Sequence, residues 1–123
     1  MQLKIADKYI KINLLNTETS EIIQKSKNFV SRISTWGDEI YFKTPIKGVK
    51  LEENTSDIMK FGEIAYWVEG CSVAIGFGPT PASVKDEIRL VSKVNIWANF
   101  DINNWDVNFF KQIKDGDIVE FIN

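Results

Sequence analysis

Histidine is absent from this 123-residue chain, and cysteine occurs once. The missing histidine excludes Ser–His and Cys–His nucleophile pairs, histidine metal sites and the usual general base near neutral pH. A single cysteine excludes an intrachain disulfide, and the two absences together exclude zinc sites built from Cys and His. Any catalysis would have to use carboxylates, lysine, tyrosine or no proton transfer. We therefore expect no metal site and no cofactor.

Long apolar runs and clusters of basic residues are also absent. No apolar run approaches the roughly 20 residues of a membrane-spanning helix, and residues 1–12 alternate polar and apolar side chains, unlike a signal peptide. The net charge is −2, with lysines and arginines scattered along the chain. A nucleic-acid partner would need a basic stripe. We expect a cytoplasmic protein without nucleic-acid or membrane partners.

The length and the 44% hydrophobic content are sufficient for one domain, residues 1–123, with a single core. Alternating segments between turn residues predict strands over residues 2–6, 9–14, 29–36, 39–44, 63–67, 72–77, 94–100 and 118–122. Helices are predicted over 17–27 and 105–113, capped by Asn16 and Asn104. Residues 82–92 read as a surface excursion. This pattern predicts a mainly β chain that closes into a barrel of about eight strands with two short helices over its ends.

The chain is organised around residues 62–81, which read as two strands followed by a stiff loop. A turn at Glu69-Gly70 joins the strands, and the segment Gly78-Pro79-Thr80-Pro81 closes the pair. Glycine permits a positive φ and each proline fixes φ near −65°, so the loop is rigid by construction. Such a loop is either purely structural or holds the threonine hydroxyl beside aromatic rings in a preformed pocket.

Three blocks of sequence carry a family resemblance, namely TWGDEIYF at 35–42, GEIAYW at 62–67 and FGPTP at 77–81. Together with the turn KDGD at 114–117, their order and spacing resemble a small cyclophilin-like family found mainly in thermophilic archaea and bacteria. The resemblance covers nearly the whole chain and implies a cyclophilin-like β-barrel smaller than a true cyclophilin. One departure is Val68-Glu69, where the family usually has two prolines, and it predicts a more mobile turn carrying an extra carboxylate.

The resemblance leaves the function open. True cyclophilins isomerise X–Pro bonds with an arginine beside an apolar pocket that also holds a tryptophan and a histidine. The histidine is missing here, and Arg32 lies in a strand that only loosely resembles the one bearing the catalytic arginine. The aromatic-rich context that follows that arginine is not reproduced.

The leading hypothesis is a non-catalytic binding module that holds a peptide segment or small ligand in an aromatic-lined pocket. Strand alternation places Tyr66 and Trp67 on opposite faces, so one ring fills the barrel and the other lines an opening, unless both belong to the core. Glu39 and Tyr41 share a strand face, where a carboxylate and a phenol can together bind an amine, an amide or arginine. The favoured interpretation, however, is that this face is exposed and that Glu39 is simply solvated. The candidate ligand-binding residues are Trp36, Glu39, Tyr41, Tyr66, Trp67, Phe77 and Thr80.

Two alternative functions remain. The first is a peptidyl-prolyl isomerase that uses Arg32, since the reaction needs no proton acceptor. The second is a homo-oligomeric scaffold whose interface contains Trp97, Phe100 and Trp105, although these residues can equally pack the C-terminal helix onto the barrel. Cys71 reads as a small buried apolar residue.

Overall fold

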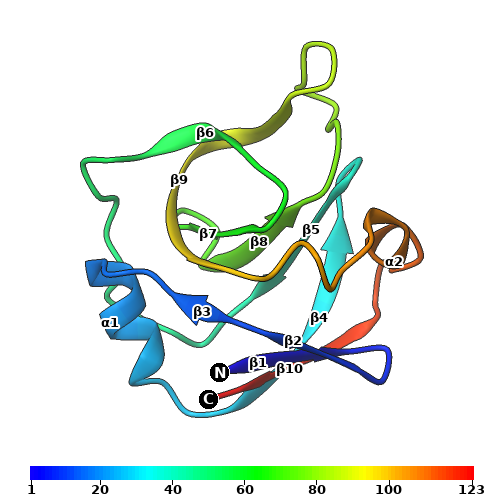
Figure 1. Cartoon of the computed structure of the whole chain (residues 1–123). Coiled ribbons are helices and arrows are strands. Elements are labelled where there is room, and N and C mark those ends of the chain that lie inside the picture. Colours follow the sequence, from blue (N-terminus) through cyan, green and yellow to red (C-terminus); the bar gives the residue numbers. More distant parts are fainter.

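The computed structural model describes all 123 residues and contains ten strands and two helices (Figure 1). The strands are β1 (Gln2–Ile5), β2 (Lys8–Lys11), β3 (Asn13–Leu14), β4 (Phe29–Thr35), β5 (Glu39–Lys43), β6 (Ser56–Met59), β7 (Glu63–Trp67), β8 (Ser72–Gly76), β9 (Ile88–Asn99) and β10 (Ile118–Ile122). The helices are α1 (Glu18–Gln24) and α2 (Val107–Lys111). The predicted mainly β fold with two short helices is confirmed. Neither helix has the length and apolar character needed to cross a membrane.

Nine of the strands follow one another around a nearly closed barrel. Their order is β2-β1-β10-β4-β5-β8-β7-β9-β3, every neighbouring pair is antiparallel, and β6 pairs with β9 off this path. The two ends of the path, β2 and β3, are separated in sequence only by Ile12, whose amide donates to the carbonyl of Met1 at 3.0 Å. The chain itself therefore joins the two edges, which leaves few unpaired strand groups. The predicted barrel is confirmed.

Strand alternation builds the core inside this barrel. On β5, Ile40 and Phe42 are each 1% exposed, and on β10, Val119 and Phe121 are equally buried. These residues belong to one apolar cluster that draws on nearly every strand. The intervening residues on each strand face outward, as expected for side chains that alternate between the two faces of a sheet.

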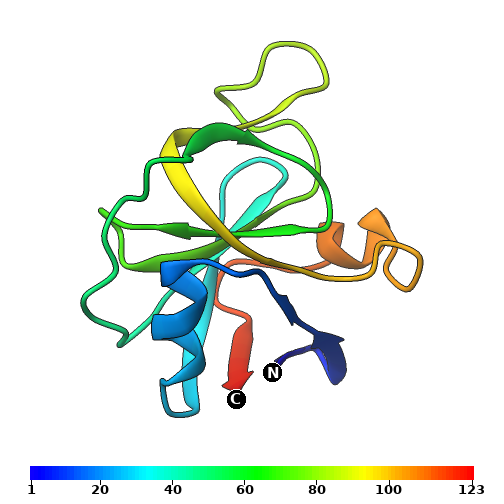
Figure 2. The same cartoon turned by 60° about the vertical axis from the view of Figure 1, so that its left-hand side comes forward.

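The two helices lie on opposite sides of the barrel (Figures 1 and 2). The hydroxyl of Thr17 caps α1 by accepting from the amide of Ser20 at 3.0 Å, and the carboxylate of Asp106 caps α2 by accepting from the amide of Asn108 at 2.9 Å. The predicted caps, Asn16 and Asn104, are therefore wrong by one and two positions. Both helices are also shorter than predicted, because capping residues and turns take up the flanking positions.

The longest strand, β9, differs most from the prediction. The segment Ile88–Ser92 was expected to belong to a surface excursion, but it forms the first part of β9 and pairs with β6. The later part of β9 pairs with β7 on the barrel path. Figure 1 shows the strand curving so that β6 and the start of β9 stand over the barrel wall. A second, smaller apolar cluster forms beneath them, comprising Met59, Ala65, Ala74, Leu90 and Val94.

One further expectation, and one residue set of an alternative hypothesis, need correction. Cys71 is exposed rather than buried, because it occupies the turn between β7 and β8 with a φ of 47°. Trp97 is 0% exposed and Phe100 is 3% exposed, so neither is available for an interface between copies of the chain. Both belong to the barrel core, and Phe100 packs on Phe110 of α2 with ring centroids 5.6 Å apart. The alternative interpretation of these residues, packing of the C-terminal helix onto the barrel, agrees with this contact.

Candidate functional site

A mainly apolar pocket of about 210 Å³ lies on the outer side of the barrel wall, between β5, β7 and the first part of β9. We call it the outer pocket, and it is lined by Trp36, Glu39, Tyr41, Trp67, Leu90, Val91, Ser92 and Val94. Four of the seven candidate ligand-binding residues therefore line one cavity. Three of them lie on the β4–β5 turn and the adjoining β5, and the fourth lies on β7, more than twenty residues later.

Trp36 and Glu39 are positioned by the tight turn between β4 and β5. Their backbones exchange two hydrogen bonds, from the Trp36 amide to the Glu39 carbonyl at 2.9 Å and in return at 3.2 Å. Between them, Gly37 has a φ of 58°, in the left-handed region that glycine tolerates best. A Cβ at Gly37 would also lie 2.8 Å from Cδ of Pro81 and 2.9 Å from Cα of Thr80. The turn is thus held against the proline loop.

The proline loop supports the pocket without lining it. The amide of Asp38 donates to the carbonyl of Pro79 at 3.0 Å, and the amide of Phe77 donates to the carbonyl of Asp38 at 2.8 Å. The hydroxyl of Thr80 donates to the carbonyl of Arg89 at the start of β9. The loop therefore connects two walls of the pocket, the β4–β5 turn and β9.

Tyr66 and Phe77 lie in the barrel core rather than in the pocket. Tyr66 is 1% exposed, and its hydroxyl lies 3.2 Å from the hydroxyl of Thr44. Phe77 is 7% exposed and stacks on Phe110 with ring centroids 5.7 Å apart. Tyr66 and Trp67 thus face opposite ways, as alternation predicted, and it is Trp67 that lines the opening.

The carboxyl group of Glu39 is the main electrostatic feature of the outer pocket. The residue is only 7% exposed, so the prediction that its side chain is solvated is wrong. The reason is that the first part of β9 packs over this face of β5, where it lines the same pocket and contacts Tyr41, and the local sequence does not reveal this. Burial raises the pKa of Glu39 from its ordinary value of 4.5 to about 7. Both ion pairs in the chain are made by Arg89, so neither neutralises this carboxyl.

Two other polar groups of the lining residues are buried without a hydrogen-bond partner within the chain, namely Nε1 of Trp67 and Oγ of Ser92. Buried polar groups are normally paired, because an unpaired one loses its hydration without compensation. The rings of Tyr41 and Trp67 meet edge to face, with centroids 6.1 Å apart and planes at 90°. The pocket therefore has aromatic walls, and two polar groups buried within its wall have no hydrogen-bond partner in the chain.

Comparison with known proteins places this architecture in a family. The model of the family described as Cyclophilin-like matches residues 1–121. The chain belongs to the cyclophilin-like family. The solution structure of a hypothetical protein from Archaeoglobus fulgidus is similar, with a TM-score of 0.78 and 31% sequence identity over 97% of this chain and 89% of that one. A search of curated proteins found no match.

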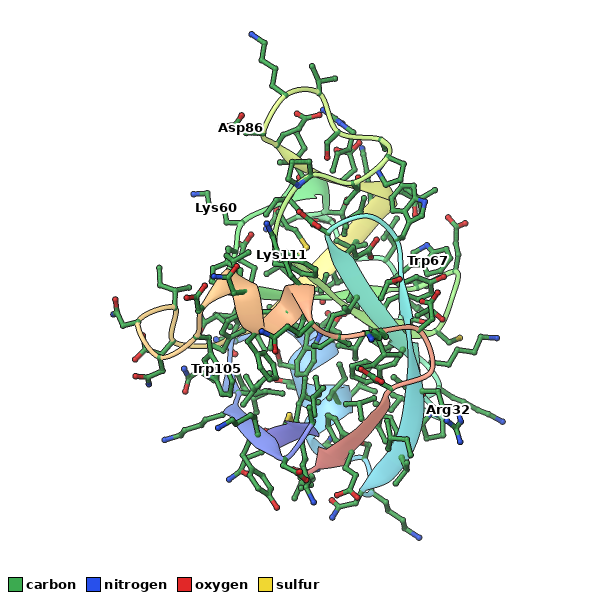
Figure 3. All side chains as sticks on the ribbon, turned by 90° about the vertical axis from the view of Figure 1, so that its right-hand side faces the viewer. Arg32, Lys60, Trp67, Asp86, Trp105 and Lys111 are labelled. Carbon is green, nitrogen blue, oxygen red and sulfur yellow. The ribbon has the colours of Figure 1, made fainter.

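In this cyclophilin-like chain, Arg32 lies outside the outer pocket but close to two of its residues. It is exposed on β4, and its Nη1 donates to the carbonyl of Gly116 at 3.0 Å. Arg32 lines a separate, more polar depression of about 560 Å³ together with Tyr41, Lys43 and Trp67. Figure 3 shows Arg32 and Trp67 on the same side of the molecule, away from Trp105. Tyr41 and Trp67 thus connect an acidic, apolar pocket with a basic depression.

Half of the pocket lining was missed from the sequence, namely Leu90, Val91, Ser92 and Val94 of β9. A signal for three of them exists. Leu90, Ser92 and Val94 alternate with charged or exposed residues, which is the period of a half-buried strand. The charged neighbours hid this pattern and made the segment read as surface.

Proposed function

We propose that this cyclophilin-like chain is a non-catalytic binding domain that holds a small ligand, or one side chain of a peptide segment, in the outer pocket. The observation that carries the proposal is the buried Glu39 carboxyl, which has no ion-pair partner and stands among the aromatic rings. A carboxyl group in such a place is destabilising for the fold alone. A ligand that pairs with it would offset that cost.

The chemistry of the lining favours binding over catalysis. Its polar side chains are the Glu39 carboxyl, the Tyr41 phenol, the Ser92 hydroxyl and the indole N–H groups of two tryptophans. The Ser92 hydroxyl has no hydrogen-bonded base within the chain to activate it as a nucleophile. A mainly apolar cavity with a few convergent polar groups is the usual form of a ligand site.

The proposal predicts that small molecules with a flat or apolar body bind at the outer pocket. In a screen of aromatic, amine, amide and proline-peptide fragments, we expect the indole N–H resonances of Trp36 and Trp67 to shift. Replacing Trp36 by alanine should weaken the binding of each fragment that shifts these resonances at least about fivefold, or about 1 kcal/mol, because one wall of the pocket is lost. Trp105→Ala is the matched control, since Trp105 is also half-buried but lies elsewhere. A screen in which no fragment shifts these resonances would contradict the proposal.

A second candidate function is peptidyl-prolyl isomerisation at the neighbouring depression. The observation that favours it is the presence of Arg32, Tyr41 and Trp67 around one surface hollow. A guanidinium beside aromatic rings can stabilise the twisted amide, and the reaction requires no proton transfer. Against it, most of the lining is polar, with Ser31, Ser34, Lys43 and Ser72 present.

Exchange spectroscopy on a short X–Pro peptide tests this candidate directly. Uncatalysed isomerisation takes tens to hundreds of seconds, so weak acceleration is detectable. If Arg32 is catalytic, Arg32→Ala returns the exchange rate to the uncatalysed value, whereas Arg89→Ala does not, because Arg89 is engaged by Asp57 and Glu87 outside the depression. Unaccelerated exchange with the wild-type chain would reject the candidate and leave the binding proposal unaffected.

A further inference from the structure

We propose that the outer pocket recognises a methylated ammonium group, the cationic head of a choline-like molecule or of a trimethyllysine side chain, in a cage formed by Trp36, Tyr41 and Trp67. This inference rests on the proposed binding function and names its ligand class. Three features of the pocket carry it: the arrangement of the rings, the isolated negative charge and the shortage of hydrogen-bond acceptors.

The aromatic residues come from three different elements and surround one cavity. Trp36 is on the β4–β5 turn, Tyr41 on β5 and Trp67 on β7. Tyr41 and Trp67 stand perpendicular at 6.1 Å, so their rings form two adjoining walls. The negative face of an aromatic ring attracts a cation within about 6 Å, and boxes of such rings are the common way to hold a quaternary ammonium. A group placed between these walls contacts several rings at once.

Glu39 contributes the only formal charge among the lining residues. Tyr41 is the only other lining residue with a titratable side chain. Because no lysine or arginine lines the pocket, the carboxylate has no cation of its own. A buried charge without a partner is costly, and an opposite charge at the same depth removes much of that cost. The pocket is therefore complementary to a cation and repels an anion.

The size and the apolar character of the pocket select a methylated nitrogen over a primary amine. Its volume of about 210 Å³ lies below the roughly 300–1,000 Å³ of drug-sized sites, so it admits a head group or one side chain. A primary ammonium brings three N–H donors, each of which needs an acceptor. The Glu39 carboxylate can accept from some of these donors, but Leu90, Val91 and Val94 on the β9 side offer no acceptor for the others, whereas N-methyl groups pack against them without a hydrogen-bonding requirement.

The test compares choline with 3,3-dimethylbutan-1-ol, which has the same shape but carries carbon in place of the charged nitrogen. The titration is followed by indole N–H resonances at about pH 8, where Glu39 is mostly ionised because its pKa is about 7. Choline should shift the resonances of Trp36 and Trp67. Trp97 is fully buried in the barrel core and Trp105 lies away from the pocket, so their resonances serve as internal controls. We expect the neutral analogue to bind at least about tenfold more weakly.

A peptide containing trimethyllysine, compared with its unmethylated form, distinguishes the two sources of the cation. Preference for the methylated peptide over both choline and the unmethylated peptide identifies a protein ligand. Preference for choline identifies a small molecule. Either preference supports a site for methylated ammonium, whereas tighter binding of the unmethylated peptide would overturn it.

Glu39→Gln keeps the size of the side chain and removes its charge. The variant should therefore lower the affinity for choline at least about tenfold and leave the affinity for 3,3-dimethylbutan-1-ol nearly unchanged. Glu69→Gln removes the same charge from the exposed β7–β8 turn and should change neither affinity. Tyr41→Leu is a second variant that keeps Glu39. It should lower the affinity for choline because one aromatic wall of the pocket is lost. Equal affinity of choline and its neutral analogue, or unchanged choline binding in Glu39→Gln, refutes the inference.

The outcomes separate this inference from the binding proposal itself. If neutral fragments shift Trp36 and Trp67 but choline and the methylated peptide do not, the ligand class is wrong and the binding function stands. If neither cations nor fragments shift these resonances, both proposals fail together.

Discussion

Replacing Phe110 by alanine is expected to lower the free energy of unfolding by about 3–5 kcal/mol, the usual cost of removing a fully buried aromatic ring. Phe110 is 0% exposed and is the one buried residue of α2. Its ring meets four others at centroid distances of 5.2 to 5.7 Å, those of Phe61, Phe77, Phe100 and Phe109. Since small domains are stable by only about 5–15 kcal/mol, this loss is a large share of the total.

Denaturant titration measures this effect as a fall in the unfolding midpoint at unchanged slope. Phe109→Ala is the matched control on the same helix. Its ring is half-buried, so the expected loss is smaller, about 1–2 kcal/mol. A loss below about 1 kcal/mol for Phe110→Ala would contradict the packing of α2 onto the barrel.

The Phe110 variant also separates the two apolar clusters of the molecule. Phe110 belongs to the barrel core, whereas Leu90 and Val94 of the outer pocket belong to the smaller cluster beneath β6 and β9. We therefore expect Phe110→Ala to reduce stability while the chain that remains folded keeps its ligand affinity at the outer pocket. The β-wall of β5, β7 and β8 serves both clusters, one on each face.

Local patterns in the sequence predicted much of this wall. The alternation in EIYFK correctly placed Ile40 and Phe42 on one face and Glu39 with Tyr41 on the other, because a strand's side chains alternate whatever covers them. The same rule separated Tyr66 from Trp67. Gly37 and the proline loop were recognisable as rigid elements because glycine and proline act on their own backbone.

What covers each face could not be read from the same patterns. Glu39 looked solvated because a glutamate on the outer face of a strand usually is. Its burial depends on β9, which lies about fifty residues later in the chain and whose first residues looked like a polar loop. Cys71 was misjudged for a related reason, since its exposure follows from a left-handed turn conformation that a non-glycine residue seldom adopts. Long-range coverage and unusual turns thus account for the errors that matter to the site.

The burial of Glu39 predicts an unusual dependence of stability on pH. Raising its pKa from 4.5 to about 7 means that the folded chain holds this proton more tightly than the unfolded chain. Below about pH 4.5 the group is protonated in both states and contributes no difference. As the pH rises toward 7, the unfolded state loses the proton first, so the free energy of unfolding falls by about 3 kcal/mol in total and then becomes level.

Glu39→Gln should abolish this component, because glutamine stays neutral at every pH. The variant is expected to match the wild type at acidic pH and to exceed its stability by about 3 kcal/mol near pH 8. Hydrogen bonds from Thr35 to Asp115 and from Arg89 to Glu87 lower the pKa values of those two carboxyls, so they lose stabilising interactions as the pH falls. Their effect is the same in both chains and cancels in the difference between variant and wild type.

The measurement is a series of denaturant titrations of both chains across this pH range. Glu69→Gln, in an exposed turn, controls for loss of one negative charge and should change stability by less than about 0.5 kcal/mol throughout. A constant difference between Glu39→Gln and the wild type at all pH values would show that Glu39 is well solvated in the folded chain. A difference that grows with pH and shrinks when choline is added would connect the destabilising carboxylate to its ligand, since a bound cation favours the ionised form. On that result, the instability that Glu39 introduces into the free protein and the affinity of the outer pocket have the same physical origin.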